Sequence, residues 1–159
     1  MIIFEVFIMI RYRYATLKDL DLLVQIRLRD LKLFSKKEVK KETIKQIRNF
    51  YHDGLCNQTC MTLLGYDQDI LIATGTLYFY PVIPSNNNIT GIMGQITNIY
   101  VDKAYRHQGI ASYIIKTLIL KGQDQTDCFC LNASKEALPL YQKLGFQVKD
   151  NYMIYQKDG

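Results

Sequence analysis

One segment of the chain organises the interpretation of the rest: Ile99-Tyr100-Val101-Asp102-Lys103-Ala104-Tyr105-Arg106-His107-Gln108-Gly109-Ile110-Ala111-Ser112. It begins with apolar, strand-like residues, passes through a short loop and a turn of small residues, and leads into an amphipathic run over 112–121. The turn has the pattern Arg106-x-x-Gly109-x-Ala111. A glycine lets the backbone approach a ligand closely. The first N–H groups of a helix are unpaired donors at the positive end of its dipole. The segment therefore predicts a site that binds a phosphorylated ligand.

The size and composition of the chain are those of an ordinary globular protein. It has 159 residues, of which 48% are hydrophobic and 22% are charged. This predicts a single domain over 1–159 that can bury a full core. The apolar start, 1–10, lacks the basic region and cleavage site of a signal peptide and is too short to span a bilayer. We interpret residues 1–8 as an N-terminal extension, or as a lengthening of the first strand, and predict no membrane partner.

The charge balance suits a small anionic ligand. The net charge of +5 is too weak to indicate a nucleic-acid partner by itself. One segment, 36–48, is strongly basic, and we interpret it as a solvated helix face. A more specific alternative is that this segment forms a rim that attracts acidic groups of a ligand. A nucleic-acid-binding surface is the least favoured interpretation. The basic residues of this segment are Lys36, Lys37, Lys40, Lys41, Lys45 and Arg48.

The four cysteines do not have the spacing of a metal site. Cys56 and Cys60 form a C-x3-C pair, and Cys128 and Cys130 form a C-x-C pair. A structural zinc site usually contains C-x2-C pairs. We therefore predict reduced thiols, no metal, and a reducing compartment, most simply the cytoplasm.

Apolar periodicity and turn residues divide the chain into alternating strands and helices. A capping-box-like start, Thr16 to Asp19, opens the first helix, Ser35 is the expected N-cap of the second, and Gly145 follows the last. The pattern predicts an α/β fold with a mixed sheet in which 92–101, a helix and 127–131 form a parallel crossover. The predicted strands are 10–15, 59–65, 70–80, 92–101, 127–131 and 146–156, and the predicted helices are 17–33, 36–51, 109–121 and 134–144.

This element order, the Arg106-x-x-Gly109-x-Ala111 turn and the later run Leu140-Tyr141-Gln142-Lys143-Leu144-Gly145-Phe146 resemble the GNAT N-acetyltransferase superfamily. The resemblance covers 10–156 and is sharpest over 95–146. It implies a GNAT-like fold and acetyl-CoA as the cosubstrate. It also implies transfer of the acetyl group to a primary amine, of a small molecule or a protein, by direct attack in a ternary complex. Acetyl-CoA is then expected where the strands 92–101 and 127–131 splay apart.

The resemblance also implies roles for individual residues. The backbone of Ile99, Tyr100 and Val101 would pair with the pantetheine arm, and the Ile99 N–H would stabilise the oxyanion. Tyr141 would protonate the leaving thiolate, and Asn132 would touch the pantetheine or orient Tyr141. Ordinary core packing is the alternative for Ile99, Val101 and Tyr141, and a solvated side chain is the alternative for Arg106. The pyrophosphate would be held by the backbone N–H groups of Arg106, His107, Gln108, Gly109, Ile110, Ala111 and Ser112.

The chain departs from the pattern at the general base. Some members carry a glutamate four residues before the oxyanion donor, and this chain has Gln95 there, which cannot accept a proton. We predict a water relay or a base from elsewhere, with His52, Glu5 and Asp53 as candidates. The missing glutamate also keeps a second hypothesis open, a CoA-binding module without useful catalysis.

The amine side is less well determined. We expect it to be formed by the helices 17–33 and 36–51, the loop 81–91, the end of the chain and an aromatic wall of Tyr78, Phe79 and Tyr80. The sequence leaves open the identity of the amine and whether the chain forms a homodimer.

Overall fold

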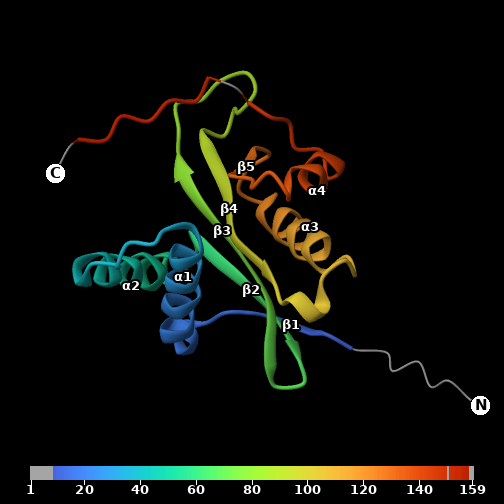
Figure 1. Ribbon diagram of the computed structural model, residues 1–159. Coiled ribbons are helices and arrows are strands. Elements are labelled where there is room, and N and C mark those ends of the chain that lie inside the picture. The colour runs from blue at the N-terminus through green and yellow to red at the C-terminus, as the bar shows by residue number, and fades with distance from the viewer. Residues whose placement is uncertain (1–8, 150, 158–159) are drawn as a thin grey trace, which may run out of the picture.

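The structure of the protein, a computed structural model, describes residues 9–149 and 151–157. Its centre is a five-stranded sheet in the order β1-β2-β3-β4-β5 (Figure 1). The first four strands pair antiparallel and β5 pairs parallel with β4. This confirms the predicted mixed sheet and its one parallel crossover. The strands are β1 (Arg11–Tyr14), β2 (Cys60–Asp67), β3 (Ile70–Pro81), β4 (Ile92–Val101) and β5 (Phe129–Leu131).

Helices cover both faces of the sheet. The helices α1 (Leu20–Phe34) and α2 (Lys41–Cys56) lie on one face, and α3 (Ile110–Gly122) and α4 (Leu138–Lys143) lie on the other (Figure 1). Each face has its own apolar layer, since burial of apolar surface is the main force that holds a helix on a sheet. The α3 layer contains Leu77, Ile96, Ile114, Ile115 and Leu118. The α1–α2 layer contains Leu23, Ile26, Tyr51, Cys60 and Leu64.

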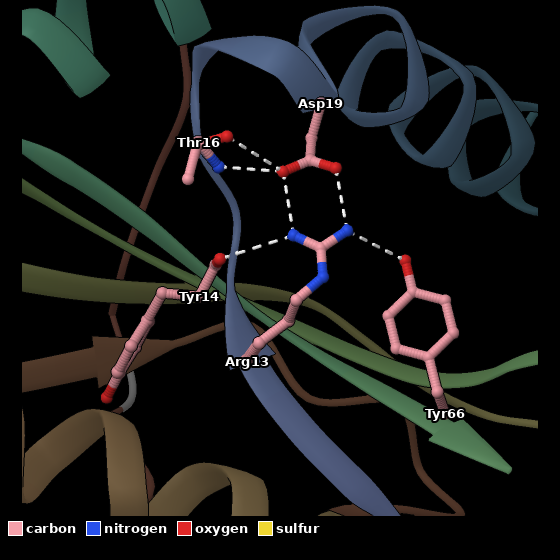
Figure 2. A network of polar contacts seen from close by, with 5 residues as sticks. All are labelled: Arg13, Tyr14, Thr16, Asp19 and Tyr66. Carbon is pink, nitrogen blue, oxygen red and sulfur yellow. Dashed lines mark hydrogen bonds and ion pairs between the residues drawn. The ribbon is translucent and has the colours of Figure 1, made fainter. Parts of the chain in front are cut away.

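A polar network fixes the direction in which α1 leaves the sheet (Figure 2). The Arg13 guanidinium of β1 donates two hydrogen bonds of 2.8 Å to the carboxylate of Asp19, just before α1. The same carboxylate accepts hydrogen bonds from the Thr16 N–H at 2.8 Å and from the Thr16 hydroxyl at 3.3 Å. Arg13 also reaches the Tyr66 hydroxyl of β2 at 3.3 Å. The capping-box-like start predicted at Thr16 and Asp19 is thus tied to two strands.

The second helix differs from its predicted bounds. It begins at Lys41 rather than at residue 36, because Ser35 caps the end of α1 and its hydroxyl accepts a hydrogen bond from the Lys37 N–H at 3.2 Å. It also continues past the expected stop at 52–54. Gly54 is buried inside α2, where a Cβ atom would stand 2.5 Å from the Cβ of Cys60. The glycine therefore marks close packing of α2 on β2 and does not end the helix.

The end of the chain corrects two further predictions. The helix α4 spans only Leu138–Lys143, although Gly145 follows it with a φ of +96°, as expected for a residue after a helix. The last predicted strand, 146–156, is not formed among the described residues: Phe146 packs on the α3 layer, residues 151–157 are exposed, and β5 has β4 as its strand partner in the described sheet. In Figure 1 this segment runs in red past the end of the sheet where β3 joins β4. Tyr152, Met153, Ile154 and Tyr155 are exposed there. The suggested N-terminal extension, 1–8, lies outside the described residues.

Candidate functional site

The strands β4 and β5 stop pairing halfway along β4. Their register joins Gly94 to Phe129, Gln95 to Cys130 and Ile96 to Leu131. Beyond Ile96, β4 continues to Val101 while β5 has ended. Within the described part of the chain, the edge of β4 past Ile96 therefore has no strand partner on the β5 side. Backbone donors and acceptors on such an edge can pair with an extended ligand.

The backbone of β4 is irregular at the point where this edge begins. Asn98 has a φ of +52°, and the pairing of β3 with β4 shifts between Thr74 and Thr76. The Asn98 carbonyl accepts a hydrogen bond of 3.0 Å from the Thr74 hydroxyl of β3. In a trans peptide the carbonyl and the following N–H point in opposite directions. The N–H of Ile99 therefore points away from Thr74, toward the uncovered side of β4.

Side chains from two helices hold Asn98 in this conformation. Its Nδ2 donates to the Tyr51 hydroxyl of α2 at 2.8 Å, and its Oδ1 accepts from Arg27 Nη1 of α1 at 3.1 Å. Asn98 is 7% exposed. Asparagine tolerates a positive φ better than most residues. The sequence TN at 97–98 inside a strand is the signal that could have indicated this bulge.

The predicted pantetheine residues lie on both faces of β4. The Ile99 side chain is half-buried on the α3 face, beside Ile114 over Gly75. Tyr100 lies on the α1 face, where the Arg29 guanidinium stacks over its ring at 3.8 Å from the centroid. The Val101 carbonyl accepts a hydrogen bond of 3.0 Å from Arg106 Nε. Arg106 thus ties the predicted phosphate loop to the end of β4.

The start of α3 is open. Gly109 has a φ of +79°, and a Cβ atom at this position would meet nothing within 4 Å. The first helical hydrogen bond runs from the Tyr113 N–H to the Gly109 carbonyl at 3.0 Å. The N–H groups of Gly109 to Ser112 therefore remain as the unpaired donors of a helix start. The predicted cradle has exposed side chains at Arg106, His107 and Gln108, a buried Ile110, and half-buried Ala111 and Ser112.

Tyr141 and Asn132 have different surroundings. Tyr141 is 8% exposed and belongs to the apolar cluster in which Ile99 and Leu131 also pack. Its ring lies edge-on to Phe146 at 6.0 Å, and burial raises the pKa of its phenol. Asn132 directly follows β5 and is exposed. The structure therefore places Tyr141 in the same cluster as the predicted oxyanion residue and leaves Asn132 at the surface.

Gln95 stands in a row of neutral side chains. The register across the sheet aligns Cys60, Tyr78, Gln95 and Cys130 on one face. Burial raises the pKa of Cys60 to about 12, and it also raises the pKa of Tyr78 and of Cys130. These groups stay protonated near neutral pH and cannot serve as bases there.

The other candidate bases lie elsewhere. His52 and Asp53 are exposed on α2 and pair with each other at 2.9 Å, and Glu5 lies outside the described residues. Among the described residues, no group of three or more His, Cys, Asp or Glu side chains could hold a metal ion. No described helix combines the length and apolar character that crossing a membrane requires.

Comparison with known proteins identifies the family. A family model described as an acetyltransferase (GNAT) domain matches residues 61–148, which is more than half of the chain. The chain belongs to the GNAT acetyltransferase family. This GNAT protein is similar to a predicted acetyltransferase from Clostridium acetobutylicum, solved with acetyl-CoA. The two share 32% identity with a TM-score of 0.84 over 93% of this chain and 96% of that one.

More distant structures share the GNAT fold. An N-acetyltransferase from Ralstonia eutropha has 18% identity and a TM-score of 0.76 over 93% of this chain and 99% of that one. Glucosamine-6-phosphate N-acetyltransferase from Arabidopsis thaliana has 19% identity and a TM-score of 0.69 over 94% and 99%. No curated protein matches the sequence.

Sequence reasoning missed the charged residues on the α1 face that packs on the sheet of this GNAT protein. Arg27, Arg29 and Asp30 all lie on or beside the helix face that packs on the sheet, and Asp30 is only 6% exposed. Burial raises the pKa of the Asp30 carboxyl, and the adjacent Arg29 opposes that rise. The sequence did contain a signal for these residues: three charged side chains fall within 27–30, next to the apolar stripe of the helix. Charged side chains in such a position are rarely buried without a partner, so contacts among them or with the sheet could have been expected.

Proposed function

We propose that this GNAT protein transfers the acetyl group of acetyl-CoA to a primary amine by direct attack in a ternary complex. The observation that carries the proposal is the uncovered edge of β4, which leads directly into the open start of α3. The uncovered edge of β4 suits the extended pantetheine arm that carries the thioester, and the open start of α3 suits a pyrophosphate. The solved relative with acetyl-CoA supports the same donor.

The donor would be held largely by backbone. The polar groups of Ile99 to Val101 would pair with the pantetheine, and the N–H groups of Gly109 to Ser112 would bind the pyrophosphate. The Arg106 Nε holds the loop to β4, so the Nη groups are the part of that side chain that would meet a phosphate. Loop residues Arg106, His107 and Gln108 complete the proposed cradle, with Asn132 at the edge of the pantetheine.

The reaction would begin when the neutral amine nitrogen attacks the thioester carbon. The C–N bond forms, and the N–H of Ile99 stabilises the charge that develops on the carbonyl oxygen. The C–S bond then breaks, and the phenol of Tyr141 gives its proton to the CoA thiolate. The proton released by the amine would pass to water, because the side chains next to Gln95 are neutral thiols and a phenol, and water would return a proton to the Tyr141 phenolate.

The direct test is to incubate the protein with acetyl-CoA and a panel of amines. We expect an N-acetylated product, detected by its mass, and an equal amount of free CoA. Product detection is needed because the exposed Cys56 thiol would itself react with a thiol reagent. Binding of acetyl-CoA without product from any amine would overturn the proposed transfer.

A CoA-binding module without useful catalysis is the second candidate, and Gln95 is the observation that favours it. Calorimetry with acetyl-CoA, run beside the turnover assay, separates the two functions, since the module binds the donor and forms no product.

We also propose a reducing, cytoplasmic setting and an amine as partner rather than a nucleic acid. The four cysteines are free thiols, and the basic side chains of 36–48 are exposed, those of Lys41, Lys45 and Arg48 on α2 and those of Lys36, Lys37 and Lys40 in the segment before it.

A further inference from the structure

Arg27 is a half-buried arginine with a neutral partner. Its Nη1 donates to the amide oxygen of Asn98 at 3.1 Å. None of the ion pairs between described residues includes Arg27. A guanidinium that is partly removed from water loses hydration, and a neutral amide oxygen compensates this loss less well than a carboxylate or phosphate does. Arg27 therefore keeps the capacity to bind an anion.

The neighbouring Arg29 differs from Arg27 because it has a charged partner. Its Nε contacts the Asp30 carboxylate at 3.5 Å, and its Nη2 contacts the Thr74 hydroxyl at 3.4 Å. The charge of Arg27 also opposes the rise in the pKa of Asp30, but it is the weakest of the influences that do so. Arg29 is thus paired with the Asp30 carboxylate, and Arg27 is in none of the ion pairs formed by described residues.

The position of Arg27 relates it to the proposed reaction. It holds Asn98, whose neighbour Ile99 supplies the proposed oxyanion donor. The helix α1, which carries Arg27, covers one face of the sheet, and α3, whose start is the proposed pyrophosphate site, covers the other (Figure 1). A second substrate that approaches from the α1–α2 face would meet Arg27 next to the thioester.

Aromatic residues surround this position. The Asn98 side chain that accepts from Arg27 donates to the Tyr51 hydroxyl, and Phe50 packs edge-on against both Tyr51 and Tyr78. Tyr78 in turn packs edge-on against Phe50 at 5.2 Å and lies 6.0 Å from Tyr80. Such surroundings lower the local dielectric constant and strengthen an ion pair.

We infer that the amine acceptor carries a carboxylate or a phosphate close to its amino group, and that Arg27 binds this anionic group. The inference rests on the proposed function, because it assigns a substrate class to the same site. The arginine supplies two parallel donors to either anion, which fixes the orientation of the acceptor. Its amine is then turned toward the β4 edge at Ile99.

The first experiment uses the unaltered protein and pairs of amines in which one member carries an anionic group and the other a neutral group in its place. Glycine and β-alanine are compared with their amides, and aminoethyl phosphate is compared with aminoethanol. We expect kcat/KM to be about tenfold or more higher for the anionic member, since a hydrogen bond to a charged group is worth on the order of 1.5–3 kcal/mol. The amino groups of the amides are less basic, so a larger fraction of them is neutral and able to attack near neutral pH. This difference alone would make the amides the faster substrates. The two pairs distinguish a carboxylate site from a phosphate site.

The second experiment uses variants of α1 and α2. Arg27→Gln is expected to raise KM for the anionic amine about tenfold more than KM for its neutral counterpart, whereas any fall in kcat from the lost hydrogen bond to Asn98 should be the same for both. Arg27→Lys keeps the charge and should recover part of the affinity. Arg48→Gln is the control, because it removes one positive charge from an exposed pair with Asp21.

Each outcome has a defined meaning. Equal or better turnover of the neutral amines by the unaltered protein overturns the inference and leaves the proposed function intact. An equal fall in kcat/KM for both members of a pair in Arg27→Gln also overturns it, since Arg27 would then only position Asn98. If no amine is acetylated, the proposed function fails. Anion binding is then measured by the thermal stabilisation that each amine gives in the presence of CoA. Stabilisation by the anionic member that Arg27→Gln abolishes supports the binding site, and its absence overturns it.

Discussion

Gly109 has a backbone conformation and an open surrounding that make it the most specific residue of the proposed donor site. Its φ is +79°, and a Cβ atom there would meet nothing within 4 Å. We expect Gly109→Ala to lower stability by about 1 kcal/mol through backbone strain alone. The new methyl group would stand where the pyrophosphate approaches, so KM for acetyl-CoA should rise more than about tenfold, or about 1.4 kcal/mol.

Gly145→Ala is the matched control for this substitution. Gly145 also has a positive φ, +96°, and open surroundings. Its replacement should cost similar stability in a urea titration without a change in KM for acetyl-CoA. If the two variants have the same KM, the turn at Gly109 does not contact the donor.

Tyr141 is the residue whose hydroxyl, rather than its ring, is expected to matter. Burial raises the pKa of the phenol, which keeps it protonated at neutral pH but makes proton transfer to a thiolate less favourable. We therefore expect Tyr141→Phe to lower kcat about 100-fold, at the low end for a general acid, with little change in melting temperature. Tyr105→Phe removes a hydroxyl bonded to Asp67 and serves as the control. An unchanged kcat in Tyr141→Phe would assign Tyr141 to core packing only.

At the scale of elements, the junction of β1 and α1 depends on one ionised carboxyl group. The Arg13 guanidinium lowers the pKa of Asp19 from 3.8 to about 2. Its contribution to stability is present above pH 3.8 and is lost as the pH falls through about 2. We expect Asp19→Asn to cost about 1–2 kcal/mol at pH 7, and the difference from the unaltered protein to shrink between pH 4 and pH 2. Urea unfolding across this range measures it.

Asp21→Asn is the comparison for that measurement. Asp21 forms an exposed pair with Arg48, with 85% of the side chain accessible, and exposed pairs contribute little. A loss in Asp21→Asn as large as in Asp19→Asn would mean that general charge, rather than the junction, explains the effect.

The same scale shows which elements could be predicted. The order β4-α3-β5 and the turn at Gly109 were predictable because apolar periodicity and the position of a glycine are local properties of the sequence. The end of α2 was not, because Gly54 looks like a helix terminator and its burial against Cys60 depends on the distant strand β2. The prediction of a last strand over 146–156 was wrong for a similar reason. A strand forms only where a neighbouring strand pairs with it, and this depends on residues distant in the sequence.

The acceptor side was the least predictable part of the candidate site. Arg27 and Asn98 are 71 positions apart in the chain, and each looks ordinary in its own element. Only the packing of α1 across β4 brings them together. The roles of Ile99, Tyr141 and the pyrophosphate-binding loop were implied by the resemblance to the GNAT superfamily, and they stay predictions until the donor is bound and the variants are measured.

At the scale of the whole molecule, binding of acetyl-CoA should raise the free energy of unfolding. A ligand that binds only the folded state stabilises it by about 2.7 kcal/mol at a hundred times its Kd. In a chain of this size each kcal/mol corresponds to about 2–4 °C. We therefore expect acetyl-CoA, and CoA itself, to raise Tm by about 5–10 °C in a thermal shift assay. Adenosine lacks the pyrophosphate and the pantetheine arm and should raise Tm far less. An unchanged Tm at saturating acetyl-CoA would contradict a donor site.

The peptide bond between Asn98 and Ile99 joins the two halves of the proposed reaction. Its carbonyl is held by Thr74, and the Asn98 side chain is held by Arg27 and Tyr51. Its N–H faces the side proposed for acetyl-CoA. The peptide group is planar and rigid. A substrate that fixes its orientation from one side therefore fixes it for the substrate on the other side. Such coupling is reciprocal. The two substrates should therefore bind cooperatively, each tightening the Kd of the other by the same factor.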